Sequence, residues 1–126
     1  MKRVHISRTI DAPAADAWTV LVDLDRWPEW GPSVRSATLD NPPMELGSRG
    51  TVTTSVGVAL PFEVTEFEPG RCWSWKVAGV PATDHSVEPI GTARCRVTFG
   101  VPTITWPYLI ICRIALGRIA AIAENL

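Results

Sequence analysis

His85 is the residue in this chain best suited to acid–base chemistry. The chain holds two histidines, and imidazole is the side chain whose ordinary pKa lies nearest neutral pH. In the alternating stretch 84–90, His85 shares one face with Val87, so the pattern points its ring towards an apolar interior. A histidine held in a partly dry pocket can act as a general base near neutral pH. An ordinary solvated histidine at a strand end is the open alternative.

Tyr108 supplies a second candidate group and is the single tyrosine of the chain. It falls on the apolar stripe of the last helical stretch, where its hydroxyl could donate a hydrogen bond to a carbonyl or an enolate. Trp73 and Trp75 alternate on one strand face and could flank a ligand. The pair His85 and Tyr108 therefore forms a candidate catalytic pair for proton transfer. A core aromatic with its hydroxyl at the rim is the alternative for Tyr108.

The sequence contains no motif for several other common catalytic or metal-binding sites. There is no GxSxG, no P-loop, no GxGxxG after a strand and no HExxH. His5 and His85 are well separated and the carboxylates are scattered, which does not favour metal binding. Cys72, Cys95 and Cys112 are odd in number and lack CxxC spacing, so we expect buried, reduced thiols. We therefore expect no metal and no cofactor.

Bulk composition limits the class of protein. At 126 residues, the chain is expected to form a single domain over residues 1–126. An apolar content of 46% argues against disorder, and a net charge of −1 argues against nucleic acid as a partner. The first residues show no apolar run of signal-peptide length. Because unpaired cysteines also fit a reducing compartment, we expect a cytoplasmic protein.

Hydrophobic periodicity predicts the elements that must position these side chains. Alternation predicts seven strands, at about residues 2–10, 33–39, 48–56, 60–68, 72–77, 84–90 and 93–99. Two short helices are expected after the first strand, since Pro13 suits a first helical turn and Asp25 can cap a second helix. Gly79-Val80-Pro81 is expected to be a loop. The short turns between strands predict an antiparallel meander.

The last stretch, residues 103–126, is predicted to be one long helix. Its apolar stripe has helical spacing and consists of Ile104, Tyr108, Ile111, Ala115, Ile119 and Ile122. The stretch is long enough to span a bilayer, but Arg113 and Arg118 would each cost about 2.5–3.5 kcal/mol inside it. We therefore expect no stable membrane insertion. The apolar surface is wider than one stripe, so contact with a partner or a homodimer is an open alternative.

A family resemblance extends along nearly the whole chain. The residues that carry it are Ala12-Pro13, Trp18, Asp23-x-x-Arg26-Trp27-x-x-Trp30, Leu46-Gly47, Glu68-Pro69 and Glu88-Pro89…Gly91-Thr92. At these places the chain resembles the START-like (SRPBCC) superfamily, in particular its polyketide cyclase/dehydrase and lipid-transport branch. The resemblance implies an α+β helix-grip fold: a curved seven-stranded antiparallel sheet wrapped around a long C-terminal helix, with two short helices after the first strand. It also implies an apolar cavity between helix and sheet, which the tight loops predict to be small.

Period-two alternation and the helical stripe, placed on that fold, predict the side chains that face the cavity. They are Val52, Thr54, Phe62, Val64, Trp73, Trp75, His85, Val87, Cys95, Val97, Tyr108, Ile111, Cys112 and Ala115. A single β-bulge would invert part of this set.

Three functions follow as hypotheses. The first, which we favour, is binding of a small hydrophobic or aromatic molecule, lipid-like or polyketide-like, in that cavity. The second is a polyketide cyclase/dehydrase-type enzyme that uses His85 and Tyr108 for proton transfer. The third is an interaction protein that uses the apolar C-terminal helix.

Overall fold

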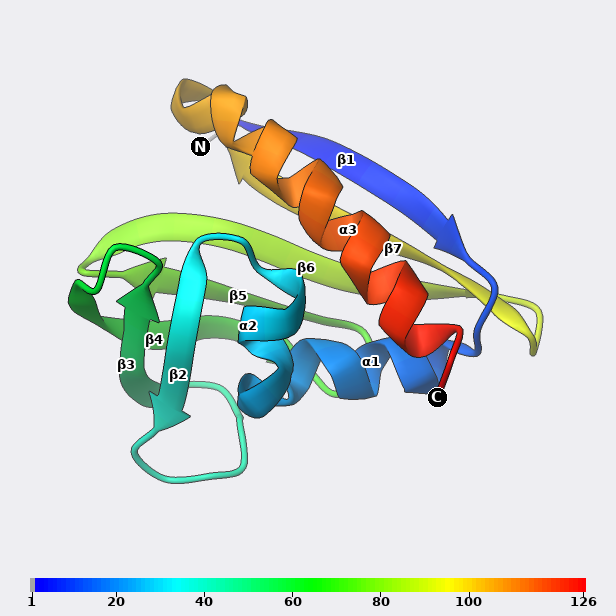
Figure 1. Ribbon diagram of the computed structural model, residues 1–126, viewed down its shortest axis with the longest axis horizontal. Coiled ribbons are helices and arrows are strands. Elements are labelled where there is room, and N and C mark those ends of the chain that lie inside the picture. The colour runs from blue at the N-terminus through cyan, green and yellow to red at the C-terminus, as the bar shows by residue number, and fades with distance from the viewer. Residues whose placement is uncertain (1) are drawn as a thin grey trace.

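One antiparallel sheet forms the frame of the molecule, as the computed structural model shows for residues 2–126 (Figure 1). Its strands are β1 (Arg3–Ile10), β2 (Val34–Leu39), β3 (Arg49–Thr54), β4 (Ala59–Glu68), β5 (Cys72–Val77), β6 (Val80–Ile90) and β7 (Arg94–Pro102). The spatial order is β1-β7-β6-β5-β4-β3-β2. Strands β2 to β7 therefore form the predicted meander. Strand β1 pairs with β7 and is an edge strand of the sheet.

The turn between β5 and β6 differs from the prediction. Ala78 and Gly79 both have positive φ, 51° and 78°, as a two-residue type I′ turn requires. Val77 then pairs with Val80, so β6 begins at Val80 and the predicted loop 79–81 is wrong. A register shift between Ser74 and Lys76 accompanies the pairing of Lys76 with a proline in β6, which fits the preference of strand prolines for bulges.

Two short helices follow β1, as predicted: α1 (Ala14–Val22) and α2 (Trp27–Trp30), with the 3₁₀ turn η1 (Leu24–Arg26) between them. The cap of η1 is Asp23, whose Oδ1 accepts from the backbone N–H of Asp25 at 3.1 Å, so the predicted capping role of Asp25 is wrong. The indole N–H of Trp27 donates to the carbonyl of Leu21 at 2.9 Å, which ties α2 to the end of α1.

The C-terminal segment is divided into the 3₁₀ helix η2 (Thr103–Tyr108) and α3 (Leu109–Ala123). Thr105 has non-helical angles, φ −107° and ψ 26°, and Pro107 follows within η2. The predicted stripe assumed 3.6 residues per turn, but a 3₁₀ helix has three. The helical spacing of the stripe in α3 therefore does not continue into η2. Ile104, expected to face inward, is 89% exposed, so that part of the prediction is wrong.

Helix α3 lies along β1 and β7 and contacts α1 and α2 on its other side (Figure 1). The segment Thr103–Ala123 is long and apolar enough to cross a membrane by length and composition alone, with a mean hydropathy of 1.5. Within this segment, α3 packs against the sheet and both short helices. The side chains that it buries are Cys112, Ala115, Leu116, Ile119, Ala120 and Ala123.

Candidate ligand-binding site

A cluster of aromatic rings occupies the centre of the concave sheet face. Trp27 of α2 stacks on Trp73 of β5, with ring centroids 5.3 Å apart and planes 4° apart. Trp75 meets both indoles edge-on, at 5.2 and 5.5 Å, and Phe62 packs against Trp75 at 5.3 Å. His85 stacks on Trp73 at 3.9 Å. These contacts make Trp73 and Phe62 packed core residues that hold α2 against β4, β5 and β6.

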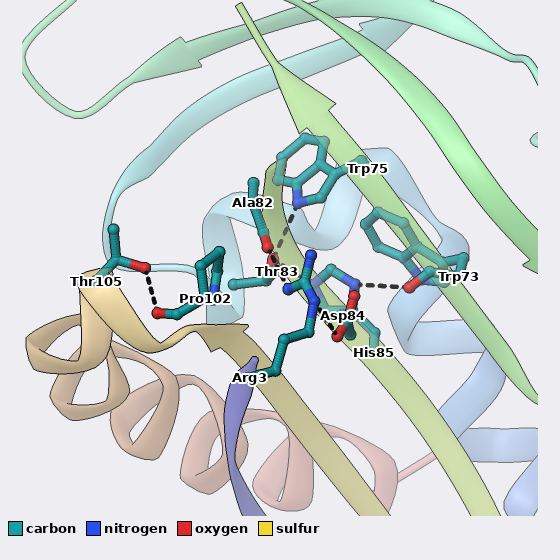
Figure 2. A network of polar contacts seen from close by, with 9 residues as sticks. All are labelled: Arg3, Trp73, Trp75, Ala82, Thr83, Asp84, His85, Pro102 and Thr105. Carbon is teal, nitrogen blue, oxygen red and sulfur yellow. Dashed lines mark hydrogen bonds and ion pairs between the residues drawn. The ribbon is translucent and has the colours of Figure 1, made fainter. Parts of the chain in front are cut away.

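His85 is held in a chain of hydrogen bonds that fixes its tautomer (Figure 2). The carbonyl of Trp73, 3.2 Å from Nδ1, can only accept, so Nδ1 carries the proton. Nε2 therefore accepts from the hydroxyl of Thr83 at 2.9 Å. The Thr83 oxygen in turn accepts from the indole N–H of Trp75 at 2.9 Å. Both ring nitrogens of His85 are thus engaged.

Burial keeps this imidazole neutral. The side chain is 2% exposed, and desolvation lowers the pKa of His85 from 6.5 to about 3, although the hydrogen bond to the carbonyl of Trp73 opposes the shift. A group with that pKa holds a proton only weakly, and its single lone pair already accepts from Thr83. The geometry therefore does not favour His85 as a general base at neutral pH.

A small cavity of about 40 Å³ lies between this cluster and α3. His85 and Tyr108 both line it, as do Ile111, Cys112 and Ala115 of α3. The structure therefore brings the two candidate catalytic residues to one cavity, together with three predicted helix residues. Its volume is close to that of one water molecule, about 30 Å³ in the liquid, which leaves no room for a substrate beside His85.

A larger cavity of about 390 Å³ opens between the free ends of the β3–β4 and β5–β6 hairpins and η2. No charged side chain lines it within residues 2–126. Side chains from β4, β5, β6, β7 and η2 contribute to its wall, including Leu60, Trp75, Val77, Thr83, Val101 and Tyr108. It is about ten times larger than the cavity beside His85.

Tyr108 stands where the two cavities meet. Tyr108, Trp75 and Thr83 line both of them. The Tyr108 hydroxyl lies 2.6 Å from Oγ of Ser33, which joins η2 to the segment before β2. Burial raises the pKa of Tyr108, so the phenol stays protonated and can donate at neutral pH. Tyr108 is therefore the predicted site residue best placed to meet a ligand through a polar group.

The remaining predicted residues divide into two groups. Val52 and Thr54 line the larger cavity with Trp75 and Tyr108. The other group borders neither of these two cavities and is at most 3% exposed: Phe62, Val64, Val87, Cys95 and Val97. Val87, Cys95 and Val97 lie where α1 and α3 pack closely onto β1, β6 and β7, so they form core instead of cavity wall. Phe62, on β4, packs instead against Trp27 of α2.

Several wall residues escaped the sequence analysis. Val77 lies on the same strand face as Trp73 and Trp75, and Leu60 precedes Phe62 by two residues, so alternation could have identified both. Val101 lies beyond the predicted end of the last strand, which reaches Pro102 in the structure. Ser33 was predicted to begin the second strand, but it lies in the turn before β2.

A long helix held against a seven-stranded antiparallel sheet, with an apolar cavity at one end of the interface, defines a helix-grip protein. Residues 1–119 match the family described as polyketide cyclase / dehydrase and lipid transport. The chain therefore belongs to this SRPBCC-type family, which confirms the resemblance in the sequence. A search of curated proteins found no match.

Solved structures share this fold at low sequence identity. A Thermobifida fusca protein has a TM-score of 0.75 and 20% identity, over 100% of this chain and 95% of that one. The Zhui aromatase/cyclase from a Streptomyces species has a TM-score of 0.74 and 12% identity, over 98% and 94%. Norcoclaurine synthase from Thalictrum flavum has a TM-score of 0.69 and 13% identity, over 98% and 94%. At these identities the likeness concerns the fold alone.

Proposed function

We propose that this protein binds a small apolar molecule, ring-sized and uncharged, in the larger cavity beside Tyr108. The observation that carries the proposal is the wall of that cavity, which is built from aliphatic and aromatic side chains with a few hydroxyls and no charged group among the described residues. Such a wall is typical of sites for apolar ligands. The family's name includes lipid transport, which fits a binding role.

Cavity size narrows the ligand class. A volume of about 390 Å³ lies near the lower end of ligand pockets, which span about 300–1,000 Å³. A fused-ring aromatic or a single short acyl chain suits this space better than a lipid with two chains. The Tyr108 hydroxyl would donate to a carbonyl or phenol oxygen at the inner end, exchanging its contact with Ser33.

The test begins with native mass spectrometry of freshly purified protein, followed by extraction and identification of any bound molecule. Displacement of the fluorescent probe 1-aminoanthracene then ranks aromatic polyketides against fatty acids. Leu60→Trp should fill the cavity and weaken probe binding by about tenfold or more, because Leu60 forms part of the wall. Leu46→Trp adds the same bulk at a 64% exposed position in the β2–β3 loop and should leave binding unchanged. Unchanged binding by Leu60→Trp would place the ligand elsewhere.

An enzyme of the cyclase/dehydrase type is the second candidate, because the Tyr108 hydroxyl lies on the cavity wall. In that case Tyr108 would donate the proton, and His85 would act only as a positioning residue through Thr83. Tyr108→Phe separates the candidates, since it keeps the ring and removes the hydroxyl. A carrier should keep its affinity within a few-fold, whereas an enzyme should lose turnover.

We also propose that the protein works in the cytoplasm. The three cysteines are free thiols in the described chain, and unpaired cysteines are usual in a reducing compartment. Expression fused to a fluorescent protein, followed by fractionation, would test this location.

A further inference from the structure

The outer side of η2 and α3 exposes large apolar side chains. Trp106, Ile110 and Ile114 are 60%, 64% and 42% exposed. They follow one another at intervals of four residues, which places the α3 pair on one helix face and Trp106 at its N-terminal end. Ile104, at 89% exposed, adjoins them in η2. This row lies on the side of the segment that the sheet does not cover.

Two arginines on α3 add positive charge to this row. Arg113 and Arg118 are exposed on α3 and form no ion pair among the described residues. The sequence from residue 102 to residue 123 contains no aspartate or glutamate. We call the six residues Ile104, Trp106, Ile110, Arg113, Ile114 and Arg118 the cationic helix face.

The cationic helix face adjoins the mouth of the larger cavity. Thr105 and Tyr108 of η2, and Pro102 directly before it, line that cavity. Val80 also lines it and is 63% exposed at the turn between β5 and β6. The segment that carries the cationic helix face therefore also forms part of the cavity wall.

The positive charge of the cationic helix face determines which kind of partner can bind it. In a symmetric dimer the same patch meets itself, so Arg113 and Arg118 would face other arginines with no carboxylate in the patch to offset them. A surface that carries negative charge matches both arginines. Tryptophan with aliphatic residues and arginine is also the composition of helices that lie in the headgroup region of a bilayer.

We propose that the cationic helix face docks on anionic lipid bilayers. Trp106 and the isoleucines enter the headgroup region, while Arg113 and Arg118 meet lipid phosphates. The helix lies on the membrane and does not cross it, because its opposite side remains packed against β1 and β7. The docked orientation turns the cavity opening towards the bilayer, although docking itself needs no ligand.

Vesicle sedimentation tests this proposal on the full chain. The protein should bind vesicles of phosphatidylcholine with phosphatidylglycerol, bind phosphatidylcholine alone much more weakly, and dissociate as salt is raised. The double variant Arg113→Glu/Arg118→Glu should weaken binding by about tenfold or more. Arg49→Glu/Arg71→Glu makes the same charge change at exposed positions on β3 and before β5, and should bind as the wild type does.

Trp106 provides a second readout. It is the only exposed tryptophan of the six, so quenching by brominated lipids should fall mainly on Trp106 and disappear in Trp106→Phe. The proposal is overturned if the protein does not bind anionic vesicles, or if the two double variants lose vesicle binding to the same extent. It is also overturned if light scattering shows a dimer that Trp106→Ala abolishes, because the occupant is then a second copy.

Discussion

His85 should make the protein sensitive to mild acid. The imidazole is buried and unprotonated in the native state, with a pKa lowered from 6.5 to about 3 by desolvation. In the unfolded chain it gains a proton as pH falls below about 6.5. Between these two values the unfolded state binds one more proton than the native state, so the free energy of unfolding decreases as pH falls.

The magnitude follows from this difference in pKa. Each pH unit within the window removes about 1.4 kcal/mol of stability. Lowering the pH from 6.5 to 4.5 should therefore cost about 2–3 kcal/mol through this residue, a large part of the roughly 5–15 kcal/mol that stabilises a typical domain.

Urea unfolding, followed by tryptophan fluorescence at a series of pH values, measures the effect. His85→Gln removes the titrating group while retaining a donor and an acceptor, and His5→Gln at the exposed histidine serves as the control. Below about pH 6, the wild-type free energy of unfolding should decrease more steeply than that of His85→Gln by about 1.4 kcal/mol per pH unit. The two proteins share every other titratable group, so the difference in slope isolates His85.

If the free energy of unfolding has the same dependence on pH in the wild type and in His85→Gln, this reasoning is refuted. Equal pH dependence would mean that the native imidazole takes up protons as easily as the unfolded one, and hence that the hydrogen bonds to Thr83 and Trp73 are not as the structure shows. That result would restore His85 as a candidate general base, so the same experiment bears on the enzyme hypothesis.

Three further predictions concern packing and thiol reactivity. Gly117→Ala in α3 should raise stability by about 0.5–1 kcal/mol in the same urea assay, because a Cβ there meets open space and alanine favours the helix; a decrease would show a hidden contact. Gly50→Ala should lower the urea midpoint by the equivalent of about 1–3 kcal/mol, because a Cβ would collide with the carbonyl of Thr38 on the neighbouring strand; an unchanged midpoint would show that β2 moves freely. Cys112 should resist iodoacetamide at pH 8 until the protein unfolds, because it is 1% exposed and burial raises its pKa to about 11; rapid native labelling, read by mass spectrometry, would contradict this.

Much of the fold could be predicted because its signals are local. Alternation along β5 identified Trp73 and Trp75 as one face, and glycine and proline marked most turns. The type I′ turn at Ala78-Gly79 was missed because alanine rarely adopts positive φ. The exposure of Ile104 was missed because a helical stripe assumes 3.6 residues per turn throughout, whereas η2 is a 3₁₀ helix.

The candidate site was harder to predict because alternation distinguishes inward from outward but not core from cavity. Val97 and Thr54 both lie on predicted inward faces, yet Val97 is fully buried in the core and Thr54 lines the larger cavity. What separates them is the course of α3, which lies along β1 and β7 and covers that side of the sheet but does not extend over β3 and β4 (Figure 1). That course is set by packing between distant segments, including the Ser33–Tyr108 contact. The larger cavity and the exposed cationic helix face therefore share one cause, which is that η2 extends past the part of the sheet that α3 covers.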